Sequence, residues 1–137
     1  MTPEAERYLA KACLTLDHAR TMLTVDLTED AGRAAYLAGY QATEAFIFER
    51  TGKAAKTHRG SAQGERTGGA HREFARLAVN EPRIDAELRR LLPQAYDLKA
   101  ICDYELGPDA VVPRDRAAAA VDAATRFIGC IAGLLTE

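Results

Sequence analysis

The chain has no tryptophan, only 7% aromatic residues and a single serine, Ser61. Aromatic and β-branched residues favour β-strands. Both kinds of residue are sparse in this chain, which argues against a β-sheet. Alanine, the strongest helix former, occurs instead in long runs, such as the four consecutive alanines at 117–120. The composition therefore predicts helices that pack closely through small side chains.

Sequence motifs for metal ions, phosphate loops and serine nucleophiles are also missing. Cys13, Cys102 and Cys130 are widely separated, form no Cys-x-x-Cys or Cys/His cluster, and lie in apolar stripes. We therefore expect buried free thiols in a reducing compartment. His18 has no companion four residues away, and no glycine motif of the dinucleotide-binding or P-loop type occurs. No metal ion and no cofactor are expected.

Long apolar runs are absent as well. Charged residues at positions 4, 6, 7 and 11 interrupt any run that would resemble a signal peptide, and no segment approaches the roughly 18 uncharged apolar residues of a membrane span. We expect a cytoplasmic protein without a membrane anchor. Its 137 residues, 47% hydrophobic and 28% charged, are typical of one globular domain over 1–137.

Apolar residues recur at helical spacing in five segments. A first helix is predicted from Thr2, as N-cap, to about Leu23, and a second from just after Thr28 to Gly52. A short helix over 74–78, a long one over 84–102 and a last one over 113–135 follow. The pattern favours an all-α antiparallel up-and-down bundle of four long helices plus one short helix.

Between Arg50 and Arg72 the helical periodicity stops, and five glycines stand among basic and small polar residues. The segment carries six basic residues against Glu65 alone, a net charge of +5 that leaves −7 for the rest of the chain. Such a long loop within one domain is usually functional or disordered. This local positive charge predicts that the segment binds an anionic partner, such as phosphate or RNA.

Three segments stand in a characteristic order: 33–45 (RAAYLAGYQATEA), 56–60 (KTHRG) and 95–105 (AYDLKAICDYE). Together they resemble the HEPN family (higher eukaryotes and prokaryotes nucleotide-binding), in particular its small single-domain bacterial and archaeal branch. The resemblance implies a bundle of four to five helices, commonly a homodimer, and in many cases a minimal nucleotidyltransferase as partner. Many members of that family are ribonuclease toxins, and others bind nucleotides or serve as accessory domains.

The ribonuclease members carry an arginine followed, after four to six residues, by a histidine near the start of a late helix. This chain departs from that pattern. The spacing occurs once, at Arg66 and His71, in a glycine-rich stretch that is expected to be a loop and to leave His71 exposed. Residues 97–104, where the motif would be expected, contain neither Arg nor His. The usual catalytic pair is therefore predicted to be absent.

His58 is the candidate catalytic group, because it lies between Lys56 and Arg59 in the predicted loop. A neutral imidazole can accept a proton from a ribose 2′-hydroxyl, while nearby cations stabilise the charge that develops at phosphorus. This would be RNA cleavage without a metal ion. The alternative is that His58 anchors the turn by binding a helix end or Asp103.

The other candidates are Arg33, Asp103 and Tyr104. In the functional interpretation, Asp103 orients His58, and Tyr104 contacts a phosphate or base or is modified by a nucleotidyltransferase partner. In the structural interpretation, Asp103 pairs with Arg33 and ties two helices together, while Tyr104 packs at the end of the bundle. The candidate residues for binding nucleotide or RNA are Arg33, Lys56, Arg59 and Tyr104.

The leading hypothesis is a HEPN-like helical protein that binds nucleotide, RNA or a nucleotidyltransferase partner, which would suit a component of a toxin–antitoxin pair. The enzymatic rival is a metal-independent ribonuclease that uses His58 with Lys56, Arg59 and Arg33 across a dimer. The third hypothesis is a purely structural interaction module, in which the Ala-rich faces of the second and last helices form a homodimer.

Overall fold

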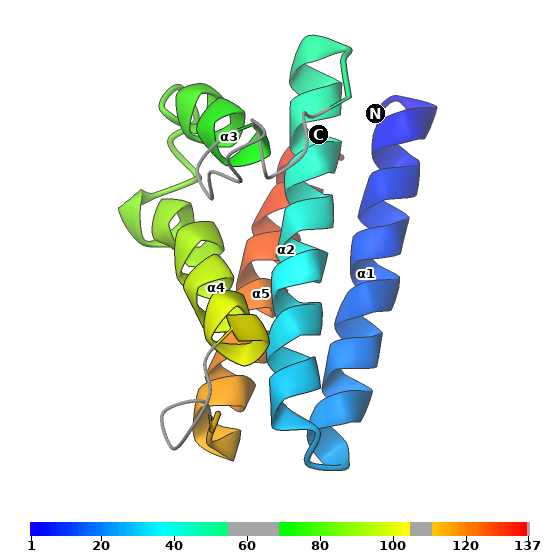
Figure 1. Cartoon of the computed structure of the whole chain (residues 1–137). Helices are drawn as coiled ribbons and strands as arrows, with labels where there is room; N and C mark the ends of the chain where they lie inside the picture. Colours follow the sequence, from blue (N-terminus) through cyan, green and yellow to red (C-terminus); the bar gives the residue numbers. More distant parts are fainter. Residues whose placement is uncertain (55–68, 105–110, 137) are drawn as a thin grey trace.

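The structure of the chain is a computed structural model that describes residues 1–54, 69–104 and 111–136. The described part contains helices and no strand (Figure 1). The helices are α1 (Pro3–Thr24), α2 (Thr28–Thr51), α3 (Ala70–Ala78), α4 (Ala86–Tyr104) and α5 (Arg114–Leu135). Four are long and one is short, which confirms the predicted all-α bundle.

Local capping marks three of the helix ends. Thr2 Oγ1 accepts a hydrogen bond from the Ala5 N–H, so Thr2 is the predicted N-cap of α1. Gly52 ends α2 in the left-handed region at φ 73°, which a residue without a Cβ adopts freely. The fourth helix begins two residues later than the apolar pattern predicts. Asp85 Oδ1 accepts the Leu88 N–H at 2.8 Å and caps it, while Ile84 is buried in the preceding turn.

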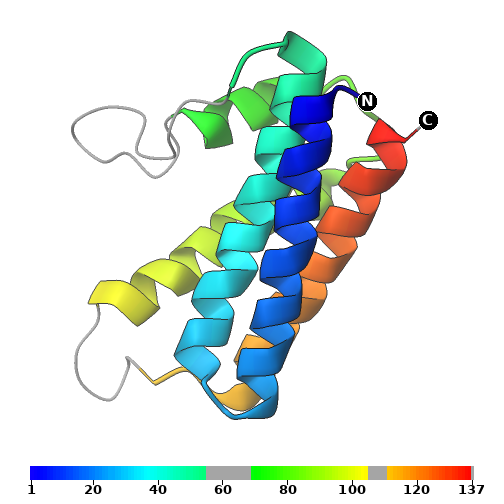
Figure 2. The ribbon, with the colours of Figure 1, turned by 90° about the vertical axis from the view of Figure 1, so that its right-hand side faces the viewer.

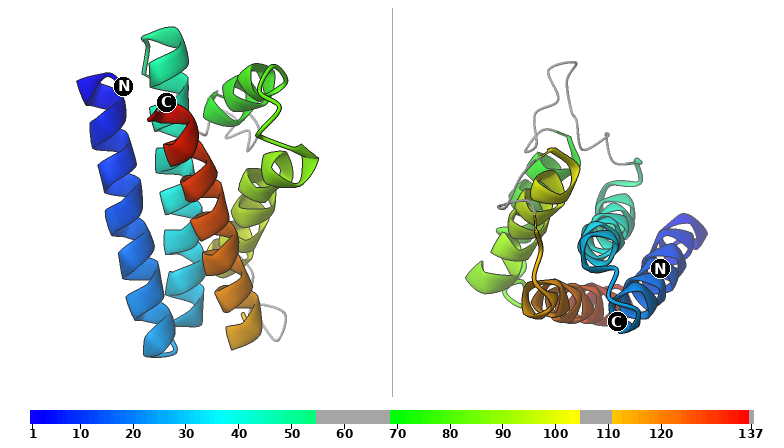
Figure 3. Two further views of the ribbon diagram at one scale, coloured as in Figure 1. Left: turned by 180° about the vertical axis from the view of Figure 1, so that it is seen from behind. Right: turned by 60° about the horizontal axis from the view of Figure 1, so that its bottom comes forward.

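The central element of the bundle is α2, which buries 14 of its 24 residues. It contacts all four of the other helices, with α1 and α4 on opposite sides of it (Figures 1 and 3). Figure 2 shows α1, α2 and α5 as long neighbouring helices. Small residues such as Ala38, Ala42 and Ala45 make this possible, because they let neighbouring backbones approach α2 on several sides. The alanine-rich composition therefore matches the observed packing.

Three phenylalanines hold the short helix α3 against the bundle. The ring of Phe74 on α3 lies 5.5 Å from that of Phe46 on α2 and 5.4 Å from that of Phe127 on α5, measured between centroids, and both pairs are edge-to-face. Aromatic pairs of this kind stabilise a core beyond the burial of their area. The position of α3 is thus fixed by residues from two other helices.

One thiol differs from the expectation drawn from the sequence. Cys102 is buried and Cys130 is partly buried, but Cys13 is exposed. The buried stripe of α1 includes Ala12 and Leu16. Each residue of a helix is rotated by about 100° from the one before, so Cys13 turns away from the core next to Ala12. The prediction of a buried thiol at this position was wrong.

By length and composition alone, α5 could cross a membrane. Core helices of globular proteins often meet the same criterion, and here one stripe of α5, which includes Val121, Phe127 and Ile131, is buried in the bundle. This packing is compatible with the soluble protein that the sequence predicts. The cytoplasmic location stays a prediction.

Candidate functional site

Two helix faces meet along the contact between α2 and α4 and bring together six charged or aromatic side chains. They are Arg33, Tyr36 and Tyr40 on α2, and Tyr96, Lys99 and Asp103 on α4. In each set the residues are spaced by three or four positions, which places them on one side of a helix. Because the two helices run in opposite directions, Arg33 meets Asp103 and Tyr36 meets Tyr96. We call this surface, together with Tyr104, the α2–α4 face.

An ion network occupies one end of the α2–α4 face. Arg33 Nε donates to Asp103 Oδ1 at 2.6 Å, and Lys99 Nζ lies 2.8 Å from Asp103 Oδ2. Arg33 also donates to Asp30 Oδ1 at 2.6 Å and to the Cys102 carbonyl at 3.1 Å. Arg33 therefore joins α2 to α4, and the structural interpretation of the Arg33–Asp103 pair is confirmed.

This network shifts the pKa values of its members. Partial desolvation alone would raise the pKa of Asp103, but hydrogen bonds from Lys99 and Arg33 more than offset it, and the pKa lies below its usual value. The same bonds to Asp103 raise the pKa of Arg33 and of Lys99. All three groups are therefore held in their charged forms near neutral pH.

Lys99 also lies between two tyrosine rings. Its Nζ is 5.7 Å from the ring centroid of Tyr96 and 5.8 Å from that of Tyr104, within the range of cation–π contact. Tyr104 is 72% exposed, so it does not pack at the end of the bundle as the structural interpretation predicted. It stands on the last turn of α4 and presents its ring to solvent beside a cation.

His71 lies in a buried cluster of tyrosines and is not the exposed residue that the sequence suggested. It is 5% exposed, in the first turn of α3, and its Nε2 lies 2.9 Å from the Tyr36 hydroxyl. Its ring is also edge-to-face with Tyr96, with centroids 5.5 Å apart, and tilted against Tyr40 at 6.5 Å. Burial, reinforced by the neighbouring tyrosines Tyr40 and Tyr96, raises the pKa of Tyr36, so its hydroxyl keeps its proton.

The predicted site residues divide into two groups. Arg33 and Asp103 are brought together as the structural interpretation suggested, and Tyr104 follows Asp103 on the last turn of α4. Lys56, His58 and Arg59, like Arg66, lie outside the described residues. Lys99 and the tyrosines at positions 36, 40 and 96 were not chosen as site residues, although the spacing of Tyr96, Lys99 and Asp103 on one helix face was a signal that could have included Lys99 and Tyr96.

Across residues 1–54, 69–104 and 111–136, no group of three or more His, Cys, Asp or Glu side chains is arranged to hold a metal ion. The groups that the α2–α4 face offers to a ligand are the exposed Tyr104 ring, the cations Arg33 and Lys99, and hydrogen-bond acceptors on Asp103.

Comparisons with known proteins identify the fold but no family. No protein-family model matches the chain, and no curated protein matches it. Among solved structures, the chain is similar to the protein TT1696 from Thermus thermophilus, with a TM-score of 0.75 and 20% sequence identity. The likeness covers 96% of this chain and 98% of that chain. Another protein therefore has a similar helical fold over nearly the whole length.

Proposed function

We propose that the protein is a HEPN-like helical module that binds RNA or a nucleotide on the α2–α4 face. The observation that carries this proposal is the exposed ring of Tyr104 with the Lys99 ammonium 5.8 Å from its centroid. Proteins that bind single-stranded nucleic acid stack bases on exposed aromatic rings and hold the backbone with adjacent cations. Tyr104 would stack on a base, and Lys99 would contact its phosphate.

Charge on the neighbouring segment supports an anionic ligand. Arg33 and Lys99 are both paired with Asp103, which reduces their attraction for phosphate. The segment from Arg50 to Arg72 carries a net charge of +5. Its end at Arg72 lies in the first turn of α3, next to His71 in the tyrosine cluster. The described end of this segment, at Arg72, thus lies beside the tyrosines of the α2–α4 face.

The resemblance to the HEPN family supports the same location. Two of the three similar segments, 33–45 and 95–105, supply the residues that meet across α2 and α4. The resemblance also implies a homodimer and a minimal nucleotidyltransferase partner, as in a toxin–antitoxin pair, and we include both in the proposal. Light scattering tests the dimer, and a strictly monomeric species at high concentration would argue against a site shared between two copies.

Cleavage is the alternative, and the position of His71 does not support it. The imidazole of His71 is buried and hydrogen-bonded to Tyr36, so it is better suited to position α3 than to contact RNA. A ribonuclease centre would therefore rest on His58 with Lys56 and Arg59. Cleavage of RNA by the wild type, resistant to chelator and lost in His58→Ala, would establish that alternative.

Fluorescence anisotropy with labelled single-stranded RNA tests the binding proposal. Stacking of one base contributes about 1–3 kcal/mol, so Tyr104→Ala should weaken binding by roughly 5- to 150-fold. Tyr104→Phe keeps the ring and should bind nearly as the wild type does. Leu14→Ala removes an exposed apolar side chain on α1 and serves as the control. Equal affinity of Tyr104→Ala and the wild type would refute the role of Tyr104.

A further inference from the structure

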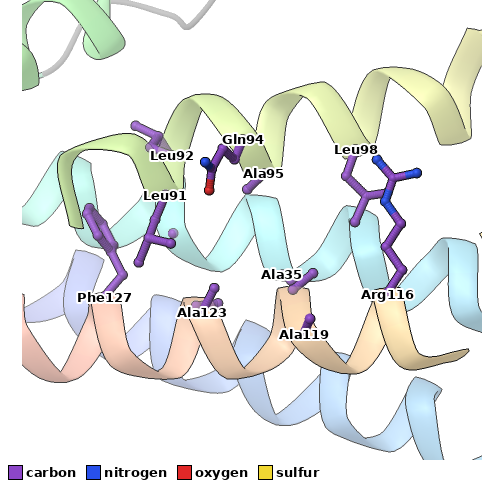
Figure 4. A pocket seen from close by; sticks show the side chains of 13 residues that line it. Ala35, Leu91, Leu92, Gln94, Ala95, Leu98, Arg116, Ala119, Ala123 and Phe127 are labelled. Atoms are coloured by element: carbon purple, nitrogen blue, oxygen red, sulfur yellow. The ribbon is translucent and has the colours of Figure 1, made fainter. Parts of the chain in front are cut away.

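A groove runs between α4 and α5, with α2 as its floor (Figure 4). Its volume is about 250 Å³. The walls are mostly apolar and come from Leu91 and Leu98 on α4 and from Ala119, Ala123 and Phe127 on α5, with the Gln94 amide as a polar group on the α4 side. The proposed nucleotide site does not use these residues, so the groove needs an explanation of its own.

The sequence explains why this space stays open. Ala119 and Ala123 are four positions apart and share one face of α5, opposite α4. The floor consists of Ala35 and Gly39 on α2. Side chains this small cannot fill the space between two helices that diverge. Toward the Phe127 end, Arg126 on α5 donates to Glu87 on α4 at 3.0 Å and links the two helices.

A cation stands at the other end of the groove. The guanidinium of Arg116 lies beside Leu98 at the margin of the apolar walls (Figure 4). Among the described residues, its guanidinium has neither an ion pair nor a hydrogen bond. The carboxylate of Asp103 is held by Arg33 and Lys99, and that of Asp115 accepts the Arg116 backbone N–H. An apolar groove that ends at such a cation suits a ligand with an apolar chain and an anionic head.

The size of the groove favours a single linear aliphatic chain as its ligand. Arg116 and Phe127 are eleven residues apart on α5, which corresponds to about 16 Å along a helix. A helix of that length and about 10 Å diameter occupies more than about 1,000 Å³, so only a small part of it would lie within the groove. A group of the size of water takes about 30 Å³, so the groove holds roughly eight such groups.

We propose that the groove between α4 and α5 binds an amphipathic carboxylate, a linear aliphatic chain of about eight methylenes with its carboxylate on Arg116. The chain would lie over Ala119 and Ala123 and end near Phe127. The carboxylate would form a charge-assisted pair with the Arg116 guanidinium, which is well suited to bidentate contact. This site is independent of RNA or nucleotide binding.

Titration of the full-length, isotope-labelled protein with decanoate below its micelle concentration tests the proposal by NMR. Saturable shifts of the methyl groups of Leu91, Ala119 and Ala123 are expected. Arg116→Gln should weaken binding about tenfold, and Ala123→Leu should abolish it by filling the groove. Arg7→Gln, which removes an exposed arginine of α1 that does not line the groove, should bind decanoate as the wild type does. Circular dichroism confirms that each variant is folded.

The proposal is overturned by any of three results. The first is that decanoate causes no saturable shifts in the wild type. The second is that 1-decanol binds as tightly as decanoate, which would remove the role of Arg116. The third is that Ala123→Leu converts a dimeric wild type to a monomer while decanoate fails to bind. That result would show that a second copy of the chain occupies the groove.

Discussion

The Tyr36 hydroxyl and His71 Nε2 lie 2.9 Å apart, and both side chains are buried where α2, α3 and α4 meet. This contact ties the first turn of α3 to the middle of α2. It therefore fixes the point at which the basic segment rejoins the bundle, next to the α2–α4 face. A histidine that the sequence suggested to be a surface residue is part of the framework of the proposed site.

Tyr36→Phe should destabilise the protein, because it removes a buried hydrogen-bonding group and leaves His71 Nε2 without this partner. The expected loss is about 1–2 kcal/mol in the free energy of unfolding, measured by urea denaturation. Tyr8→Phe is the matched control, since the Tyr8 ring packs against Phe48 and its hydroxyl has no hydrogen bond among the described residues. Equal losses in the two variants would contradict the importance of the Tyr36–His71 contact.

Arg33 and Asp103 should be energetically coupled. The side chains are 36% and 22% exposed, so the pair is partly screened by solvent, and a coupling energy of about 0.5–1 kcal/mol is expected. A double-mutant cycle with Arg33→Gln and Asp103→Asn measures it. Additive effects of the two substitutions would show that the contact does not stabilise the α2–α4 pairing.

Acid should remove the contribution of Asp103 to stability. Its pKa in the folded protein lies below the value of about 3.9 expected for an unfolded chain, so its contribution is complete above that pH and is lost as the pH falls through the folded pKa. The difference in unfolding free energy between the wild type and Asp103→Asn should be constant from about pH 5 to 7 and shrink below about pH 4. Urea denaturation at several pH values checks this, and a difference that does not change down to about pH 2.5 would contradict it.

Two glycines should respond in opposite directions to substitution by alanine. A Cβ at Gly129, inside α5, would meet no atom within 4 Å, so Gly129→Ala should stabilise the protein by about 0.5–1 kcal/mol. Gly52 has a φ of +73°, and Gly52→Ala should destabilise by about 1 kcal/mol because a side chain strains this conformation. Thermal unfolding measures both changes, and shifts of the same sign would contradict the backbone assignment at one of the two positions.

The sequence predicted the helices well because their signals are local. Thr2 and Gly52 mark helix ends through capping chemistry that involves only neighbouring residues, and apolar spacing marks the buried faces. Helical periodicity is less reliable at the edge of a stripe. Cys13 follows a buried alanine, yet it points to solvent.

The candidate site was predictable only in part, for a related reason. The Arg33–Asp103 pair joins residues 70 positions apart, and the sequence offered it as one of two interpretations. The position of His71 depends on how α3 packs, which the rings of Phe46 and Phe127 determine from other helices. A contact of that kind leaves no signal in the residues around His71, so its burial was missed.

The proposed binding face is tested most directly by mapping chemical shifts of the isotope-labelled protein during titration with a short single-stranded RNA and, separately, with AMP. We predict saturable shifts that centre on Lys99, Asp103 and Tyr104 and extend to Arg33 across the helix contact. The absence of saturable shifts, or shifts confined to surfaces away from these residues, such as α1, would contradict the proposal that the α2–α4 face binds RNA or nucleotide.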